Sequence, residues 1–399
     1  MKSVPSVSPG GSYDIVQTVF NLSILSNAAN SVTGQTATQL QALLSQRINA
    51  AFQKDVGDIG PWEIVWGPAV FEYNDSGTVD NALYVARNTA IDYYVVGVAA
   101  TNGTSHYDIY TLDLNVKKTV AFPSGITPTG CPPPSGSSAG NVSLGTALGI
   151  TNLLQLTDSS QAGSPNLQTF LAGAASSGAT LVFTGHSLGG ALSPALALWL
   201  YPQPTASPWK AVYVLPTAGP SPGDAGFRAG FAEAFQQLSI TGVNPSYGFW
   251  NTLIWNEFDA VPHAWTNIMK VQPTTTPNDI LWGSLLDQSL YGPLSKAAQG
   301  GVVPLVEYLY SLPGMTYARL PDTMFSSGYS PAEVPNLSAF EQTVLTQHIQ
   351  AYGTFFGVPI NRDIASGIGI SLLKPVPTAD RTFPESVHPE GGIAVRNAS

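Results

Sequence analysis

The chain has 399 residues, of which 44% are hydrophobic and only 10% are charged, with a formal net charge of −10 and a pI near 4.8. It carries no cluster of Lys or Arg. This argues against a protein that binds nucleic acid, and against one that binds an anionic membrane through basic charge. Its one cysteine, Cys131, excludes an intrachain disulfide and a four-cysteine zinc site.

No apolar run reaches the roughly 18 residues of a spanning helix, so the sequence predicts no transmembrane segment. The first residues lack the apolar core typical of a signal peptide. The low charge and several Asn-x-Ser/Thr triplets favour a soluble, secreted protein, but such triplets also arise by chance. The compartment therefore stays open at this point.

The first third of the chain predicts a helical segment followed by strands. Apolar residues at helical spacing in residues 36–53 predict an amphipathic helix within an N-terminal helical segment, residues 1–58. Strands are predicted at 63–74, 82–89 and 92–101, and the last of these has the continuous apolar run of a central strand. A loop rich in Pro, Ser and Gly follows.

Helices and strands then alternate. This order predicts one α/β domain over residues 1–399, with a mostly parallel central sheet flanked by helices. Residues 273–313 form an insertion with apolar patches, which predicts a cap or wall near the active site. The alternating elements are predicted helices at 142–156 and 191–201 and predicted strands at 180–185, 210–216 and 251–258.

The pattern G-x-S-x-G occurs three times, around Ser138, Ser187 and Ser221. A nucleophilic serine on this pattern needs a strand, a sharp turn and then a helix whose N-terminus faces the reacting oxygen. Ser138 lies in the Pro/Ser-rich loop, and proline on both sides of Ser221 prevents that geometry. Only Ser187 follows a β-branched and aromatic run and precedes a helix. Ser187 is the predicted nucleophile.

The segment VFTGHSLGGAL around Ser187 resembles the corresponding turn of the class 3 lipases, an α/β-hydrolase family that includes the fungal triacylglycerol lipases. Four other segments resemble family motifs in the same order, between about residues 62 and 355. They are YYVVGVAATN, NVSLGTALGI (with Ser143 and Thr146 replacing a histidine and an aromatic residue), VLPTAGPSPGDAGF (with Ala218 replacing a glycine) and NEFDAVP. The resemblance implies an ester hydrolase that needs no cofactor and no metal.

A serine nucleophile needs a histidine base, and α/β hydrolases place their functional residues in the order serine, acid, histidine. This order removes the two histidines that precede Ser187. His263 follows Asp259 by only four residues, too near along the chain to face both groups productively. His348 is therefore the predicted base, with His388 as the alternative.

Asp259 is the predicted acid, because it ends an apolar strand and is followed by Val-Pro, as in the family. Glu257 lies two residues earlier and could share its face of the strand, so it remains an alternative. The resemblance also implies a tyrosine a few residues after the histidine, which matches Tyr352.

The oxyanion of the reaction intermediate needs two donors. The backbone N–H of Leu188, the residue after the nucleophile, is the first. Thr101 is the second, because Ala100-Thr101 stands where the family has Gly-Ser or Gly-Thr. We interpret His106 and Asp108, just beyond, as solvent-exposed polar residues, with contacts to a lid as the alternative.

These features predict a serine ester hydrolase, of which a lipase acting on acylglycerols or long-chain esters is the leading interpretation. A short-chain esterase, an acyltransferase and a non-catalytic interaction module are the alternatives. The expected partners are an ester or lipid substrate and a lipid interface, and no nucleic acid.

Overall fold

The computed structural model describes residues 2–132, 139–266, 295–330 and 334–373. Within these residues a seven-stranded sheet forms the centre, in the order β12-β11-β8-β7-β4-β3-β2. The strands from β4 to β12 run parallel, and β3 and β2 extend the sheet in antiparallel pairing. The carboxyl ends of the parallel strands therefore meet at one edge, where open α/β sheets place their ligands. The strands are β2 (Glu63–Phe71), β3 (Asn81–Asn88), β4 (Tyr93–Val98), β7 (Thr180–His186), β8 (Ala211–Thr217), β11 (Leu253–Asn256) and β12 (Asp322–Phe325).

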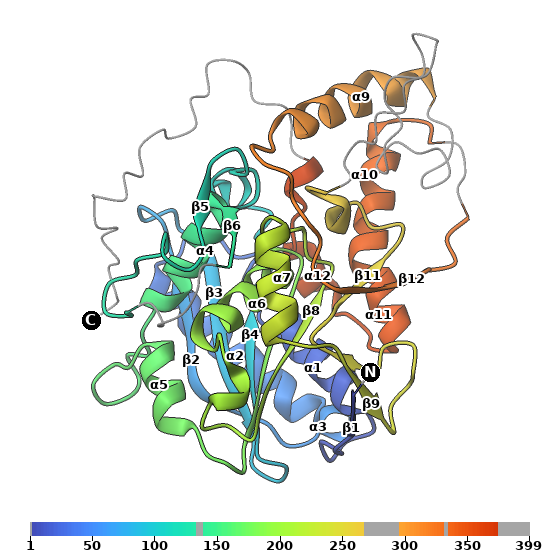
Figure 1. Cartoon of the computed structure of the whole chain (residues 1–399). Coiled ribbons are helices and arrows are strands. Elements are labelled where there is room, and N and C mark those ends of the chain that lie inside the picture. Colours follow the sequence, from blue (N-terminus) through green and yellow to red (C-terminus); the bar gives the residue numbers. More distant parts are fainter. Residues whose placement is uncertain (1, 133–138, 267–294, 331–333, 374–399) are drawn as a thin grey trace.

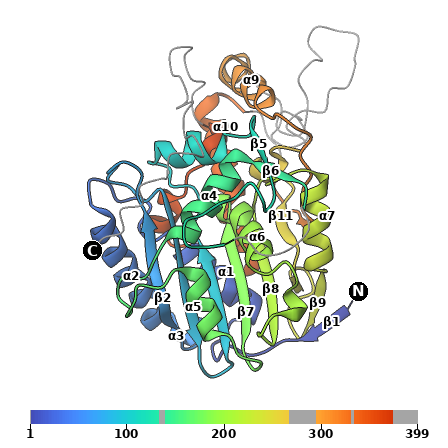
Figure 2. The ribbon, with the colours of Figure 1, turned by 60° about the vertical axis from the view of Figure 1, so that its left-hand side comes forward.

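Helices cover both faces of this sheet (Figure 2). Strand side chains point alternately to the two faces. Along β7, Leu181 and Phe183 join one hydrophobic core while Val182 joins the other. The first core lies under α4 (Leu144–Gln155), α5 (Leu167–Ala174), α6 (Leu188–Leu200) and α7 (Ala225–Ala234). The second lies under α1 (Ile15–Leu25), α2 (Ala37–Lys54), α3 (Val56–Ile59) and α11 (Ala351–Phe356).

A third hydrophobic cluster lies beyond the carboxyl edge of the sheet, where Figure 1 shows α9 and α10. It joins segments far apart in the chain, through side chains such as Val302, Phe340 and Leu372. This part of the molecule covers the edge at which the candidate site lies. Its elements, with the helices around them, are η1 (Asp108–Asp113), η3 (Val261–His263), α9 (Lys296–Ser311), α10 (Leu337–Leu345), η4 (Thr346–Gln350), α12 (Arg362–Gly367) and η5 (Ser371–Leu373); η1 and η4 are π-helices.

The predicted α/β class with a mostly parallel sheet is confirmed. The sequence patterns did not predict β12 or the two small sheets. Residues 273–294 of the predicted insertion lie outside the described residues, and α9 follows them. None of the described helices is both long and apolar enough to cross a membrane. The remaining elements are β1 (Lys2–Pro5), β5 (Thr119–Ala121), β6 (Asn141–Ser143), η2 (Pro204–Ala206), β9 (Leu238–Thr241) and β10 (Phe249–Trp250).

Candidate active site

Ser187 lies in the sharp turn between β7 and α6. Its backbone has φ 58° and ψ −124°, a left-handed region that costs energy for any residue other than glycine. Its N–H donates to the carbonyl of Thr217 at 3.0 Å, which ties the turn to the end of β8. Its own carbonyl accepts from the N–H groups of Gly190 and Ala191, at 2.8 and 3.2 Å. The chain is thus held in the conformation that a strand-to-helix nucleophile turn requires.

Three glycines make room for this turn. A Cβ atom added at Gly185 would lie 2.3 Å from the carbonyl oxygen of Gly189. One at Gly189 would lie 2.4 Å from the carbonyl oxygen of Val98, and one at Gly190 would lie 2.3 Å from that of Thr217. No side chain fits at such distances, so the start of α6 is wedged between the ends of β4 and β8.

His348 and Asp259 form a fully buried pair, and each side chain is 0% exposed. The Nδ1 atom of His348 lies 2.9 Å from Oδ1 and 2.8 Å from Oδ2 of Asp259. An ionised carboxylate can only accept, so Nδ1 carries the hydrogen and Nε2 keeps a free electron pair. This Nε2 atom is buried and has no hydrogen-bond partner among the described residues.

Asp259 is held by two further donors. The Tyr352 hydroxyl donates to Oδ2 at 2.7 Å, and the N–H of Val261 donates to Oδ1 at 3.0 Å. Burial, and then the charge of Asp259, raise the pKa of Tyr352 well above its usual value, so this hydroxyl stays protonated. The Asn256 side chain donates to both the carbonyl and the side-chain oxygen of Gln347, which fixes η4 to the end of β11.

His186, next to the nucleophile in sequence, supports the backbone of His348. Its Nε2 atom lies 2.8 Å from the His348 carbonyl oxygen, and its Nδ1 atom lies 3.0 Å from the Thr217 hydroxyl. A carbonyl oxygen only accepts, so Nε2 carries the hydrogen and the neutral ring accepts from Thr217 through Nδ1. Burial, and then His348, lower the pKa of His186 well below its usual value.

This depressed pKa predicts a pH-dependent stability. In the unfolded chain the pKa of a histidine is about 6.5, so below that pH the unfolded chain binds more protons than the folded one. The free energy of unfolding should therefore fall by up to about 1.4 kcal/mol per pH unit as the pH drops from about 6.5 toward the folded pKa. Urea unfolding at several pH values, for the wild type and His186→Gln, measures this slope. Equal slopes for the two proteins would contradict the prediction.

Thr101, Leu188 and Ser187 line one cavity. Leu188 is the first residue of α6, where N–H groups have no acceptor inside the helix and carry partial positive charge. The Thr101 hydroxyl donates to Oδ2 of Asp113 at 2.7 Å. The backbone N–H of the following residue, Asn102, donates to the side chain of Asp108, which is also in η1. The loop after β4 is thus anchored to η1.

Asp108 supplies that second carboxylate, and its predicted solvent exposure is wrong. Its side chain is 1% exposed, and its Oδ2 accepts from the N–H of Asn102 at 2.8 Å. Burial, and then the charge of Asp80, raise its pKa well above the usual value. The neighbouring His106 is exposed, as predicted. The error arose because η1 packs inward, which a polar loop sequence does not indicate.

The cavity at Ser187 has a volume of about 20 Å³. This is room for about one water molecule. Its walls include the apolar side chains of Val261, Trp265, Ile370 and Leu372. The segment that carries Ile370 and Leu372 also contacts the loop after β4. The N–H of Gly369 donates to the Thr101 carbonyl at 2.8 Å. The free space at Ser187 is therefore small in this conformation.

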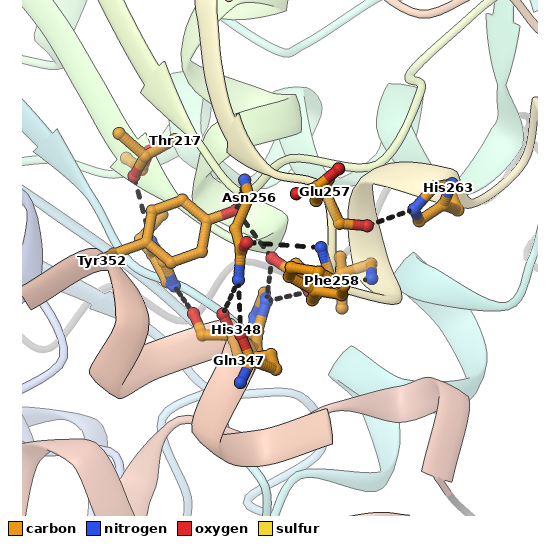
Figure 3. Close-up of polar contacts among 12 residues, drawn as sticks. Thr217, Asn256, Glu257, Phe258, His263, Gln347, His348 and Tyr352 are labelled. Atoms are coloured by element: carbon orange, nitrogen blue, oxygen red, sulfur yellow. Dashed lines mark hydrogen bonds and ion pairs between the residues drawn. The ribbon is translucent and has the colours of Figure 1, made fainter. Parts of the chain in front are cut away.

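The other candidates fall elsewhere. The N–H of Ser221 donates to the Ala264 carbonyl at 2.7 Å, in a turn with no helix directly after it. The Glu257 carbonyl lies 3.0 Å from Nε2 of His263 (Figure 3). Ser138 and His388 lie outside the described residues. Sequence reasoning missed the contacts of Asp113 and His186, because nothing local in the sequence marks either partner.

A serine on a strand-to-helix turn of a mostly parallel sheet, with a buried His–Asp pair at the same edge, is typical of serine hydrolases with the α/β-hydrolase fold. Residues 145–267 match the family model described as Lipase (class 3). This segment contains Ser187 and Asp259, so the part of the chain that carries both residues is similar to the class 3 lipases. The protein is a lipase-type serine ester hydrolase, as the sequence resemblance predicted.

The chain is similar to several solved structures, and M37 lipase shares its fold. The crystal structure of M37 lipase is 23% identical, with a TM-score of 0.61 over 88% of this chain and 96% of that one. The native propeptide complex of Rhizomucor miehei lipase is 15% identical, with a TM-score of 0.36 over 62% of each chain. Nonglycosylated LIP2 lipase of Yarrowia lipolytica is 17% identical, with a TM-score of 0.39 over 61% of this chain and 73% of that one. No curated protein matches the chain.

Proposed function

We propose that the chain hydrolyses carboxylic esters through an acyl-enzyme, with Ser187 as nucleophile, His348 as base and Asp259 as the acid that orients it. The observation that carries this proposal is the double contact of His348 Nδ1 with Asp259, which leaves a buried Nε2 without a partner among the described residues. Nε2 would take the Ser187 proton during attack on the ester carbon and return it to the leaving alcohol. Water would then release the acid by the same proton route.

The backbone N–H groups of Leu188 and Thr101 are the proposed donors to the oxyanion. Two facts support them: both residues line the cavity at Ser187, and Leu188 starts a helix whose N-terminus faces developing negative charge. Asp113 holds the Thr101 side chain at 2.7 Å, so the loop is ordered before substrate binds. Fixed donors of this kind stabilise the intermediate without reorganising during the reaction.

The proposed substrates are acylglycerols or long-chain esters that are presented at a lipid surface. A cavity of about 20 Å³ admits no acyl chain, so part of the apolar wall must move when an ester binds. The side chains that would be uncovered are apolar, and they find a favourable environment in a lipid phase and an unfavourable one in water. Each methylene that leaves water in the site contributes about 0.8 kcal/mol to binding.

A chain-length profile tests this substrate class. We expect kcat/KM on p-nitrophenyl esters of two to sixteen carbons to be highest at roughly eight carbons or more, because each buried methylene adds about 0.8 kcal/mol. We also expect the rate to rise once the ester exceeds its solubility. A steady fall beyond four carbons, with no gain on emulsions, would instead indicate a short-chain esterase.

An alcohol acceptor in the same assay separates hydrolysis from acyl transfer. Free acid should remain the main product. A new ester formed in preference to the acid would make the chain an acyltransferase, which would use the same nucleophile.

A further inference from the structure

Two asparagines in the turn after α1 contact the loop that carries Thr101. Asn27 and Asn30 are each 1% exposed. Oδ1 of Asn27 accepts from the N–H of Ala100 at 2.7 Å. Nδ2 of Asn30 donates to the carbonyl of Ala100 at 3.3 Å and to Oδ1 of Asn27 at 3.1 Å. The two side chains thus hold both polar groups of Ala100.

One of these contacts fixes the direction of the Thr101 N–H. The Ala100 carbonyl and the Thr101 N–H belong to the same peptide unit, which is planar and trans, so they point in opposite directions. When Asn30 holds the carbonyl oxygen from one side, the N–H must face the other side. A hydrogen bond to the carbonyl also polarises the N–H of the same peptide.

We propose that Asn30, supported by Asn27, is a positioning residue that aims the Thr101 N–H at the oxyanion. This inference rests on the proposed function, because it takes that N–H as an oxyanion donor. Both asparagines lie in the N-terminal part of the chain, far before the segment of residues 145–267 that matches the family model. The N-terminal segment therefore completes the site as well as covering one face of the sheet.

The cost of burying Asn30 argues for this role over a purely structural one. Its Oδ1 atom is buried and has no hydrogen-bond partner among the described residues. A buried acceptor without a partner lowers stability, and an apolar side chain of similar size would avoid this cost. An apolar side chain could not make the two hydrogen bonds of Asn30 Nδ2, which donates to the Ala100 carbonyl and to Asn27.

The test compares Asn30→Asp and Asn30→Ala with the matched variants Asn152→Asp and Asn152→Ala. Asn152 is also fully buried, donates through Nδ2 to the Tyr107 hydroxyl at 3.1 Å, and has an Oδ1 atom without a partner among the described residues. It lies in α4, on the other face of the sheet from Asn30. The aspartate variants keep the side-chain volume, so each pair includes a version without a cavity.

Two quantities are measured in the full-length protein. The first is kcat and KM on p-nitrophenyl butyrate. The second is the inhibition constant of an alkyl trifluoromethyl ketone. Ser187 Oγ forms a bond to the carbonyl carbon of this inhibitor, the carbonyl π electrons move to its oxygen, and the serine proton passes to His348. The adduct therefore has the oxyanion that the Thr101 N–H would contact.

We expect kcat of the Asn30 variants to fall about 10- to 100-fold. This loss is smaller than that caused by removing an oxyanion donor altogether, which lowers kcat by about 10²- to 10³-fold. The inhibition constant should weaken by the same factor while KM stays nearly constant. The Asn152 variants should lose stability but keep kcat and the inhibition constant. If the Asn30 and Asn152 variants change kcat and the inhibition constant equally while the wild type is active, the role of Asn30 is overturned and the proposed function stands. A wild type that neither hydrolyses the ester nor binds the ketone would overturn the proposed function and the inference together.

Discussion

Replacing Ser187 by alanine is expected to lower kcat for ester hydrolysis about a million-fold, the cost of removing a nucleophile from a serine triad. The variant keeps the proposed oxyanion donors and the His–Asp pair, so a small residual rate above the uncatalysed reaction should remain. Steady-state release of p-nitrophenol measures the loss. Titration with a phosphonate ester should modify one serine per wild-type chain and none in the variant.

The fold should tolerate this change. Alanine, like serine, has a Cβ atom, so the cost of φ 58° at this position is already present in the wild type. The unfolding midpoint in urea should therefore stay close to that of the wild type. Ser221→Ala and Ser138→Ala are the controls, because each removes the central serine of another G-x-S-x-G segment. Loss of activity in either control, with an active and folded Ser187→Ala protein, would contradict the assignment.

The turn at Ser187 was predictable because everything that defines it is continuous in the chain. A β-branched run, two glycines around the serine and a small-residue helix start specify a strand, a tight turn and a close helix–sheet contact. The distances that an added Cβ would create at Gly185, Gly189 and Gly190 give the physical reason for that local pattern. The strands next to it were predictable for the same reason, since their apolar runs follow from burial on both faces.

Contacts between distant segments were not predictable in this way. Asn30 is 70 residues from Ala100, and His186 is 162 residues from His348. Whether such residues meet depends on how α1 and η4 pack on the sheet, and no local pattern encodes that packing. The burial of Asp108 belongs to the same group, because it follows from the packing of η1 and not from the polarity of its neighbours.

The same limit applies to the cover of the site. The sequence predicted a wall from residues 273–313, on the basis of apolar clusters and loop length. Residues 273–294 of that stretch lie outside the described residues, so this wall stays a prediction. Among the described residues, the cavity is lined by Ile370 and Leu372, together with residues just after Asp259. An apolar side chain near the end of a chain carries no sign of what it covers, so its place became visible only in the folded structure.

Replacing Asp259 by asparagine is expected to lower kcat about 10⁴-fold, as the equivalent change does in a serine protease triad. The amide has nearly the same shape but brings an NH₂ group to His348 Nδ1, which now lies 2.8 Å from Oδ2 of Asp259. Nδ1 would then accept from the amide, and the hydrogen would move to Nε2, the nitrogen that must accept the Ser187 proton. The loss therefore comes from the wrong tautomer, while the nucleophile stays in place. Steady-state kinetics on p-nitrophenyl butyrate measures it.

Glu257→Gln is the matched control, because it makes the same carboxylate-to-amide change two residues away on the same strand end. Its backbone carbonyl, which is the group that lies near His263, is unchanged by the substitution, so activity should stay near that of the wild type. KM should change little in both variants, since neither side chain lines the cavity at Ser187. With the NH₂ group at the Oδ2 position, the amide oxygen still accepts from the N–H of Val261. The Tyr352 hydroxyl can accept the second amide hydrogen, so the fold around position 259 should persist. An active Asp259→Asn protein together with an inactive Glu257→Gln protein would transfer the orienting role to Glu257.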